Sequence, residues 1–396
     1  MGYGILLIFA LGALDWELPL TQTTFLDRNS TELSRFRFEA EPKLKFYSDS
    51  AFSTEISARG WLDPVPKHEA KYFLDLRSAW VEGKFLPWTI RLGTQQIVWG
   101  EALHFFSADV LHPKDFRDLF LNSLESSRIP QTGILVTGDN ETWGIQLIYF
   151  PWSRVNHYPE WLSQFSLPQY SIESLGLANP ETEKIFEFSE PALAGNLRLN
   201  IERAEIHLMG GMIRDPQPYF RVDSARVFES HDRMEFVGLT LSYAWESILL
   251  RAESLLYPRR KLNALGPGAS LTHHKVGELN SLGSTEYSGV DDVIVSLQIY
   301  WNQRYDCKSS QILPCRTIQE NAKVLWMNLP WQLEFESSLW VEAKDPSFWW
   351  SNKIRRNFGD HLKAELSVEE FFGSGSGLFA NLRNRDQVIS KVEYRF

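Results

Sequence analysis

The sequence predicts an all-β protein, a transmembrane antiparallel up-and-down β-barrel of about 16–18 strands with a short helical segment inserted near residues 102–128. Three observations support this fold class. Apolar and polar residues alternate along most of the chain, as they do in a sheet with one apolar and one polar face. The alternating runs are about 9–12 residues long, which is the length that a tilted strand needs to cross a bilayer. Short turns are interleaved with long polar segments.

The first clear alternation is LSRFRFEAEPKLKF, which begins at Leu33. One face is wholly charged and the other is mainly apolar. The charged face contains Arg35, Arg37, Glu39, Glu41, Lys43 and Lys45, and the apolar face contains Phe36, Phe38, Ala40, Leu44 and Phe46. In a membrane barrel the apolar face meets lipid and the charged face lines a wet lumen, so we expect Arg35 and Arg37 on the lumen wall.

The same pattern recurs in NLRLNIE, QLEFESSLWVE and HLKAELSV. In the second of these runs, Glu334 and Glu336 share a face that is opposite Leu333 and Phe335, which places both glutamates on the lumen wall. A soluble β-sandwich also alternates, but its strands are commonly only about five or six residues long.

Aromatic residues and turns mark the predicted strand ends. The aromatic residues are Tyr149 to Trp152, Tyr257, Tyr300, Trp301, Trp331, Trp349 and Trp350, where interfacial belts are expected. Tight turns are predicted at Arg203-Ala204, Trp245-Glu246, Pro330-Trp331 and Gly359-Asp360, and long connections at 151–194, 258–275 and 304–321. Counting back from the C-terminus gives roughly seventeen strands, whereas bacterial barrels favour even numbers. One strand is therefore miscounted or hidden before Leu33.

The last residues, VISKVEYRF, place Val388, Val392, Tyr394 and Phe396 on one face and finish on phenylalanine. This ending resembles the terminal-strand signal by which Gram-negative outer-membrane barrels are recognised for insertion. Tyr394 and Phe396 are therefore the candidate membrane insertion signal, and the expected location is the outer membrane.

Residues 1–28 are predicted to be a signal peptide or N-terminal segment, and residues 29–396 a single barrel domain. The apolar run from Ile5 to Leu14 resembles the core of a secretory signal and is too short for a membrane helix, which needs about 20 residues. A first barrel strand is the alternative, because no Lys or Arg precedes the run and no clean A-x-A site follows it.

The net charge of the chain argues against one class of partner, and its two cysteines are a candidate disulfide. A net charge of −10 and a pI near 5.5, with no basic block, argue against nucleic acid as a partner. The two cysteines, Cys307 and Cys315, lie in the polar stretch DCKSSQILPC without metal-knuckle spacing. They are a candidate disulfide, and two free thiols in a loop are the alternative.

The stretch RLGTQQIVWGE, from Arg91 to Glu101, contains residue types that catalytic sites use. Its spacing indicates something else, because Arg91, Gly93 and Gln95 share the lumen face of a strand. Regular alternation then stops, and a polar stretch follows that carries Asp109, Asp115, Arg117, Glu125 and Arg128.

From Pro113 to Ser126 the spacing of Phe116, Leu119, Phe120 and Leu124 predicts an amphipathic helix. Its charges favour a position in the lumen, where Arg91 would pair with Asp109, Asp115 or Glu125, because buried charges are tolerated chiefly when paired. The candidate constriction residues are Arg91, Gln95, Glu101, Asp109, Asp115, Arg117, Glu125 and Arg128. An extracellular cap is the alternative position for this segment.

The same residues resemble a known family. The runs Arg91-x-Gly-x-Gln-x-x-x-Trp-Gly-Glu101, Asp109, Pro113-x-Asp-x-Arg117 and Ser127-Arg-Ile-Pro130 are similar to a porin-like Gram-negative outer-membrane family carried as a domain of unknown function, and EYSGVDDVIVSLQ from Glu286 to Gln298 extends the likeness. The resemblance implies a barrel fold, export and a role in permeation, with hydrophobic compounds among the candidate solutes. It supplies no catalytic residues.

Enzyme and metal signatures are absent from the sequence. No G-x-S-x-G, H-E-x-x-H or phosphate-binding loop occurs, and His273-His274 in a polar loop is a weak metal candidate, so we expect no cofactor and no metal. The functional hypothesis is a passive or substrate-selective channel for a small solute or a hydrophobic compound, surrounded by the lipid bilayer and lipopolysaccharide. Its rivals are a structural or assembly barrel that docks a periplasmic or surface protein, and an outer-membrane lipid hydrolase.

Overall fold

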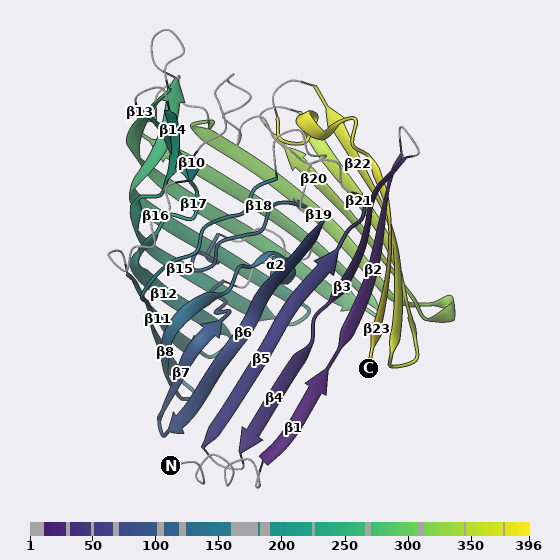
Figure 1. Ribbon diagram of the computed structural model, residues 1–396, viewed down its shortest axis with the longest axis horizontal. Helices are drawn as coiled ribbons and strands as arrows, with labels where there is room; N and C mark the ends of the chain where they lie inside the picture. Colours follow the sequence, from purple (N-terminus) through teal and green to yellow (C-terminus); the bar gives the residue numbers. More distant parts are fainter. Residues whose placement is uncertain are drawn as a thin grey trace.

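The computed structural model describes residues 12–28, 32–48, 51–65, 71–100, 107–118, 124–159, 181–182, 191–223, 226–265, 271–307, 313–343, 346–374 and 377–396. Strands form nearly all of the regular structure (Figure 1). Among the described residues, no helix is long and apolar enough to cross a membrane.

The main sheet contains twenty strands. They are β1 (Gly12–Glu17), β2 (Pro19–Asp27), β3 (Leu33–Ala40), β4 (Lys43–Ser48), β5 (Phe52–Leu62), β6 (Tyr72–Phe85), β7 (Trp88–Gln95), β8 (Gln131–Asp139), β9 (Trp143–Phe150), β11 (Ala192–Ile201), β12 (Ala204–Arg214), β15 (Arg233–Trp245), β16 (Ile248–Leu265), β17 (Leu271–Val290), β18 (Val293–Tyr305), β19 (Arg316–Leu329), β20 (Leu333–Glu342), β21 (Ser347–Phe358), β22 (Leu362–Gly373) and β23 (Gln387–Arg395).

Smaller elements lie in the connections. They are β10 (Glu181–Thr182), β13 (Tyr219–Asp223) and β14 (Arg226–Ser230), which form a separate three-stranded sheet, the helix α2 (Leu124–Ser127), and the 3-10 turns η5 (Pro330–Gln332) and η6 (Ala380–Leu382).

Each strand of the main sheet pairs antiparallel with its neighbours, and β2 closes the ring by pairing with β23 from Pro19↔Arg395 to Asp27↔Gln387. The registers of β1 with β4 and of β2 with β3 are continuous across Leu18 and Pro42, so each broken pair is one wall strand. Counted in this way, the barrel has 18 strands, and the predicted fold class is confirmed at the upper end of the predicted strand number.

The strand hidden before Leu33 is the one formed by β1 and β2. Residues 12–27 lie within the stretch that the sequence assigned to a signal peptide or N-terminal segment, and here they form wall strands that close the barrel. A domain boundary at residue 29 therefore cuts through the first hairpin. Three consecutive apolar residues, Leu18-Pro19-Leu20, obscure its alternation in the sequence, and Pro19 cannot donate to the strand ladder.

The two ends of the barrel differ as predicted. Short turns join β6 to β7, β8 to β9, β11 to β12, β15 to β16, β17 to β18 and β21 to β22 at one end, and the longer connections lie at the other (Figure 1). The predicted long connection at 258–275 is wrong for most of its length, because β16 continues to Leu265 and β17 begins at Leu271. We call the two ends the short-turn end and the loop end.

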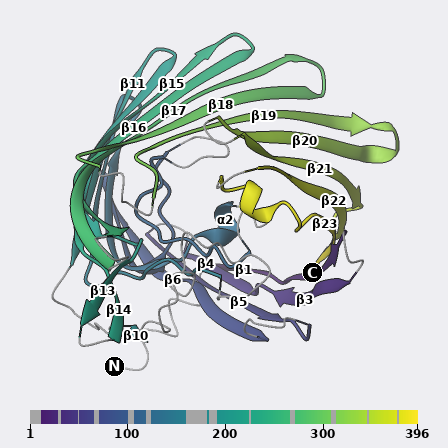
Figure 2. The same ribbon diagram turned by 90° about the horizontal axis from the view of Figure 1, so that it is seen from above.

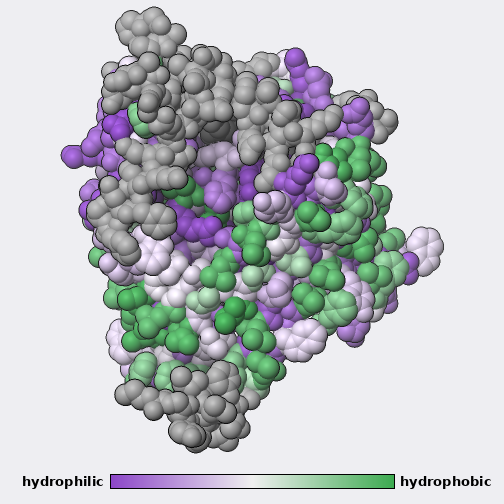
Figure 3. All heavy atoms as spheres, in the orientation of Figure 1, coloured by the Kyte–Doolittle hydropathy of each residue, from purple (hydrophilic) through white to green (hydrophobic). Residues whose placement is uncertain are grey.

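The outer face of the wall is apolar. Figure 3 shows hydrophobic side chains gathered over the strands and hydrophilic ones toward the loop end on the face in view. Exposed aromatic residues form two belts. Trp16, Trp88, Trp143, Trp245, Trp326 and Tyr394 lie near the short-turn end, and Tyr149, Trp152, Trp301, Tyr305 and Trp350 lie near the loop end. Tyr257 and Trp349, which the sequence assigned to these belts, are instead buried in the barrel interior.

The predicted helix from Pro113 to Ser126 is wrong over Pro113–Asp118. That part is an irregular chain with single bridges from Lys114 to Arg128 and from Asp115 to His157. Its backbone donors find partners outside a helical ladder, since Asp115 N donates to Ser127 O at 2.7 Å and Phe116 N to His157 O at 2.7 Å. The only helix in the described part of this segment is α2, and residues 119–123 lie outside the described residues.

Candidate functional site in the barrel lumen

The chain leaves the wall at Gln95, the last residue of β7, and returns at Gln131, the first residue of β8. We call residues 96–130 the inserted segment. Figure 2, which views the barrel from above, shows α2 inside the ring of strands. The described parts of the inserted segment contact two different regions of the inner wall, one apolar and one basic.

The apolar contact begins at Ile97 and Trp99. Together with Ala108, Val110 and Leu111, they pack against inward-facing residues of β8, β9, β11, β12, β15 and β16. The wall residues in this cluster are Leu135, Ile148, Phe150, Ala192, Ala194, Met209, Ile213, Met234, Phe236, Leu255 and Tyr257. Part of the lumen wall is therefore apolar, and the inserted segment covers that part instead of leaving it to water.

Trp99 and Gly100 are explained by this contact. Only 2% of Trp99 is exposed, and its indole Nε1 donates to Gln146 Oε1 at 2.7 Å. Gly100 has a φ of +90°, and a Cβ there would lie 2.8 Å from both Ala108 Cβ and Glu253 Oε1. Glu253 is held in this place, because its Oε2 also accepts the backbone N–H of Ala108 at 2.9 Å. Glycine is therefore needed at position 100.

The basic contact comes from four buried arginines on three wall strands, which are Arg35 and Arg37 of β3, Arg59 of β5 and Arg77 of β6. We call them the arginine wall. Asp118 of the inserted segment pairs with Arg35 and, at 2.5 Å, with Arg37 Nη1. One carboxylate thus neutralises part of the charge of two guanidinium groups.

Arg59 and Arg77 hold the backbone around α2. Arg59 Nη1 donates to Ser126 O at 2.7 Å, and Arg77 donates to Arg128 O at 2.5 Å and to Glu125 O at 3.0 Å. The pairing of β5 with β6 shifts register next to Arg77, which is the kind of bulge that re-aims a side chain. Cations suit these carbonyl groups, since the end of a helix carries partial negative charge.

Inside the inserted segment, Asp109 accepts from Lys114 Nζ at 2.7 Å and from Arg128 Nε at 2.7 Å. Burial tends to raise the pKa of Asp109, but Lys114 and Arg128 outweigh burial and hold this pKa below its usual value. Asp115 pairs with Arg117 Nη2 at 2.5 Å, and this pairing likewise holds the pKa of Asp115 low against the effect of burial.

His112 joins the two ends of the inserted segment. Its Nε2 accepts the N–H of Ile97 at 2.6 Å, and its Nδ1 lies 3.1 Å from the carbonyl of Ile129, which assigns the proton to Nδ1. Burial lowers the pKa of His112 to about 4, although Asp109 opposes the shift, so the imidazole is neutral at pH 7.

The residues predicted from RLGTQQIVWGE and the segment after it are not one cluster. Arg91 does not pair with Asp109, Asp115 or Glu125 but with Glu82 Oε2 of β6 at 2.6 Å, directly across the strand ladder. Gln95 is buried and donates to Gly133 O at 3.4 Å. The side chain of Glu125 is exposed, and only its carbonyl contacts the wall. Glu101 lies outside the described residues.

The remaining wall charges lie elsewhere on the ring. Glu336 of β20 accepts from Arg355 Nη1 at 3.0 Å and lies 3.2 Å from Lys323 Nζ. Glu334 is half-buried on the same strand and faces Arg355 in the pairing register. Sequence reasoning missed Arg59, Arg77 and Asp118, although the period-two spacing of Glu55, Ser57 and Arg59 would have placed Arg59 on the lumen face.

A second segment enters the lumen between β22 and β23. Its described part, residues 377–386, contains η6 and appears in yellow inside the ring in Figure 2. Phe379 and Leu382 pack against Trp349 and Phe371, with Trp340 and Leu378 at the edge of the cluster. We call residues 377–386 the aromatic-anchored segment. Glu342 Oε2 accepts the backbone N–H of Leu378 at 2.8 Å and so fixes its start.

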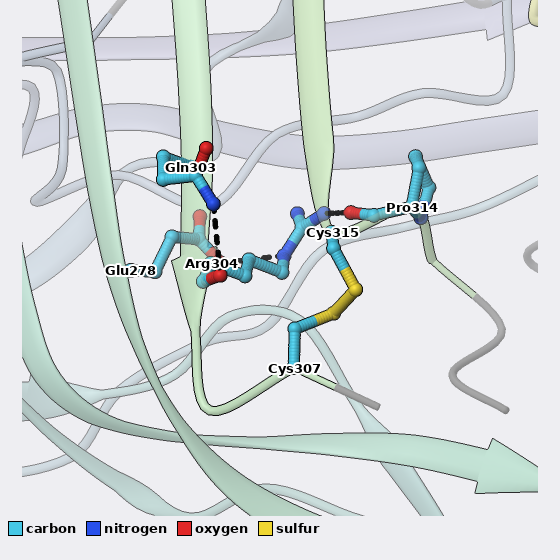
Figure 4. The surroundings of a disulfide bond; sticks show 6 residues. All are labelled: Glu278, Gln303, Arg304, Cys307, Pro314 and Cys315. Carbon is cyan, nitrogen blue, oxygen red and sulfur yellow. Dashed lines mark hydrogen bonds and ion pairs between the residues drawn. A yellow bond between two sulfur atoms is a disulfide. The ribbon is translucent and has the colours of Figure 1, made fainter. Parts of the chain in front are cut away.

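Cys307 and Cys315 form a disulfide across the connection between β18 and β19, with their Cα atoms 5.6 Å apart (Figure 4). The backbone N–H of Arg304 donates to Cys315 O at 2.8 Å, and its Nε donates to Glu278 Oε2 at 3.0 Å. Gln303 Nε2 donates to Arg304 O at 3.1 Å. The loop is thus tied covalently at its base, where the hairpin leaves the wall.

In the part of the chain that the structure describes, no group of three or more His, Cys, Asp or Glu side chains could hold a metal ion. The described residues of the lumen offer charge pairs, hydrogen bonds and apolar surface.

A closed 18-strand antiparallel barrel with an apolar outer face, two aromatic belts and a largely polar interior defines a class, the outer-membrane β-barrel of the porin type. The prediction of such a barrel is confirmed. The family resemblance is also confirmed, since a family model described as a protein of unknown function (DUF1302) matches residues 25–161.

Several solved structures resemble this fold at low sequence identity. OccAB1 of Acinetobacter baumannii has a TM-score of 0.60 and 8% identity, over 97% of this chain and 96% of its own. OpdK of Pseudomonas aeruginosa with vanillate has a TM-score of 0.55 and 11% identity, over 97% and 98%. OccK2 (OpdF) of the same organism, in complex with glucuronate, has a TM-score of 0.56 and 10% identity, over 97% and 98%. No curated protein matches the sequence.

Proposed function

We propose that this protein is a non-enzymatic, substrate-selective channel of the outer membrane whose lumen is narrowed by the inserted segment. One observation carries the proposal. The inserted segment is held on one side by the arginine wall and on the other by the apolar cluster around Trp99, so that it crosses the interior instead of lying outside the barrel.

Selection in such a channel depends on the pore radius and on the groups that face it. The arginine wall is occupied by Asp118 and by the carbonyls around α2, so its role is to hold the constriction in place. Solutes would be selected by side chains that remain accessible beside the constriction, with Arg91 among them. Gln95, Asp109, Asp115, Arg117 and Arg128 would act by shaping the constriction.

The solute class is supported by analogy and by the chemistry of the lumen. Two of the similar structures hold a small organic solute, vanillate in one and glucuronate in the other. A small solute or a hydrophobic compound is the expected cargo here, because the interior combines charge pairs with apolar surface. The expected surroundings are the bilayer and lipopolysaccharide.

Conductance across a planar bilayer tests the proposal. The folded, full-length barrel should conduct, and a variant that lacks residues 102–128 should conduct more and with less discrimination between solutes. Heat modifiability on a gel verifies that both preparations are folded. A folded barrel that is silent both with and without residues 102–128 would rule out the channel and favour an assembly role with a docked protein partner.

A further inference from the structure

A cavity of about 380 Å³ lies on the short-turn side of the inserted segment. Its wall is formed by inward-facing residues of β6, β7, β8 and β9, and its roof is formed by residues 96–98, where the chain leaves the wall. A volume of this size is within the range of pockets that hold small organic ligands, which is about 300–1,000 Å³.

The cavity has one apolar side. Ile97, Val98 and Leu135 line it, and Val98 is 49% exposed although it lies inside the barrel wall. An apolar side chain left open to water in a protein interior favours contact with an apolar surface of a ligand.

The opposite side is polar. Thr89 and Thr137 bring hydroxyl groups, and Arg91 stacks over the ring of Trp80 at 4.2 Å from its centroid. Glu82 engages Nε and Nη2 of Arg91, which leaves Nη1 as a donor toward a solute. Gln146 also lines the cavity, and its Oε1 is fixed by Trp99.

The charges of the lining are balanced. Glu82 pairs with Arg91 at 2.6 Å, and Asp139 at the rim pairs with Arg198 of β11. An ionic solute would have to break one of these pairs or enter without a counter-charge, and both are unfavourable. An uncharged solute with hydroxyl groups meets neither obstacle.

We propose that this cavity is a binding site for uncharged, hydroxylated solutes that have one apolar face, such as an aryl glycoside. The apolar face would rest mainly on Val98, beside the edge of Leu135, and the hydroxyl groups would bond to Thr89, Thr137 and Arg91. The inference deepens the proposed channel function and rests on it for the role of the site in transport, whereas binding itself can be measured without conduction.

The test uses the purified full-length barrel and two probes, phenyl β-D-glucopyranoside and its anionic counterpart phenyl β-D-glucuronide, with binding followed by titration calorimetry. The neutral probe should bind more tightly than the anionic one. Thr137→Phe, which fills the cavity, should weaken binding of the neutral probe by at least about tenfold. Thr285→Phe is the matched control, because Thr285 is exposed on the outer face of β17, and it should leave binding within about twofold.

Val98→Asn gives a second variant at an exposed position and should also weaken binding if Thr137→Phe does not fold. The site is overturned if the neutral probe does not bind, if it binds all variants equally, or if the anionic probe binds more tightly. Bilayer conductance of the same preparations separates this result from the channel function. If the barrel conducts but does not bind the probe, the binding site is refuted and the channel function stands. If the barrel binds the probe but does not conduct, the channel function is refuted and the binding site stands.

Discussion

Two segments that leave the wall fold back into the barrel, and they are held there by different forces. The inserted segment is tied to the arginine wall through Asp118 and through the carbonyls around α2. The aromatic-anchored segment is held by packing of Phe379 and Leu382 against Trp349 and Phe371. Charge pairs require partners in fixed geometry, whereas aromatic packing depends mainly on buried area. The inserted segment should therefore respond more strongly to pH and to removal of single charges than the aromatic-anchored segment, in which Glu342 accepts one backbone N–H from Leu378.

The largest effect is expected from Asp118→Asn. The substitution removes the carboxylate of Asp118 from its buried pairs with Arg35 and Arg37, and loss of one partner of a buried pair costs about 3–5 kcal/mol. The inserted segment should loosen, which is measured as faster proteolysis between residues 107 and 130 and as noisier conductance. Asp360→Asn, at an exposed turn between β21 and β22, is the control and should change neither. Unchanged protection in Asp118→Asn would mean that charge does not hold this segment.

Phe379→Ala tests the other half of the comparison. Phe379 is fully buried beside Trp349, with ring centroids 6.2 Å apart, and truncation of such a ring costs about 3 kcal/mol or more. Amide exchange should accelerate at Leu382, whose N–H donates to Phe379 O at 3.0 Å, and should remain slow at Ile129 in the inserted segment. Phe85→Ala, on the exposed outer face, should leave both amides unchanged. If both segments loosened together in Phe379→Ala, they would be one cooperative unit.

Most of the wall could be predicted from sequence because each strand separates two environments. Lipid on one side and water on the other impose a period of two, and this period places Arg35, Arg37 and Glu336 correctly on the inner face. The strand formed by β1 and β2 escaped because an apolar run and Leu18-Pro19 break its alternation. An apolar run before the first strand also imitates a secretory signal.

The candidate site was harder to predict, because its partners come from distant parts of the chain. Asp118 lies more than 80 positions from Arg35 and Arg37, and nothing in the local pattern joins them. The partner of Arg91 could have been found. A hairpin that turns at Leu86-Pro87 places Glu82 opposite Arg91 by register alone. The helix predicted from Pro113 failed because the backbone of Pro113–Asp118 bonds to neighbouring segments instead of to itself.

A pH titration separates the two segments without any mutation. The folded pKa of His112 is about 4, below the 6.5 of a free histidine, so the unfolded or displaced segment binds a proton more readily than the docked one. The stability that His112 contributes is complete above about pH 6.5 and is lost as the pH falls toward 4, and the shift corresponds to about 3 kcal/mol. Protonation of Asp109 at still lower pH acts in the same direction, because its pairing with Lys114 and Arg128 is then lost.

Proteolysis of the inserted segment should accelerate as the pH falls from 7 to 4, and the protection of the Leu382 amide relative to its intrinsic exchange rate at each pH should not change. His112→Gln removes the titrating group and should flatten the profile over this range. A profile that persists in His112→Gln would assign the pH response to another group, with His157 next in line.

The smallest effect is expected at a less buried pair of the same chemistry. β6 pairs with β7 only from Ala79 to Phe85. Asp75 lies before this paired part of β6 and forms an ion pair at 3.0 Å with Arg154, which follows β9. Arg154 is about one-third exposed, so solvent screens this pair, and its contribution should be under about 1 kcal/mol. Asp75→Asn should therefore change the unfolding midpoint and the proteolysis pattern much less than Asp118→Asn does. If Asp75→Asn had as large an effect as Asp118→Asn, the wall next to β7 would depend on the Asp75–Arg154 pair to stay closed. Burial would then not determine which of the two ion pairs stabilises the barrel more.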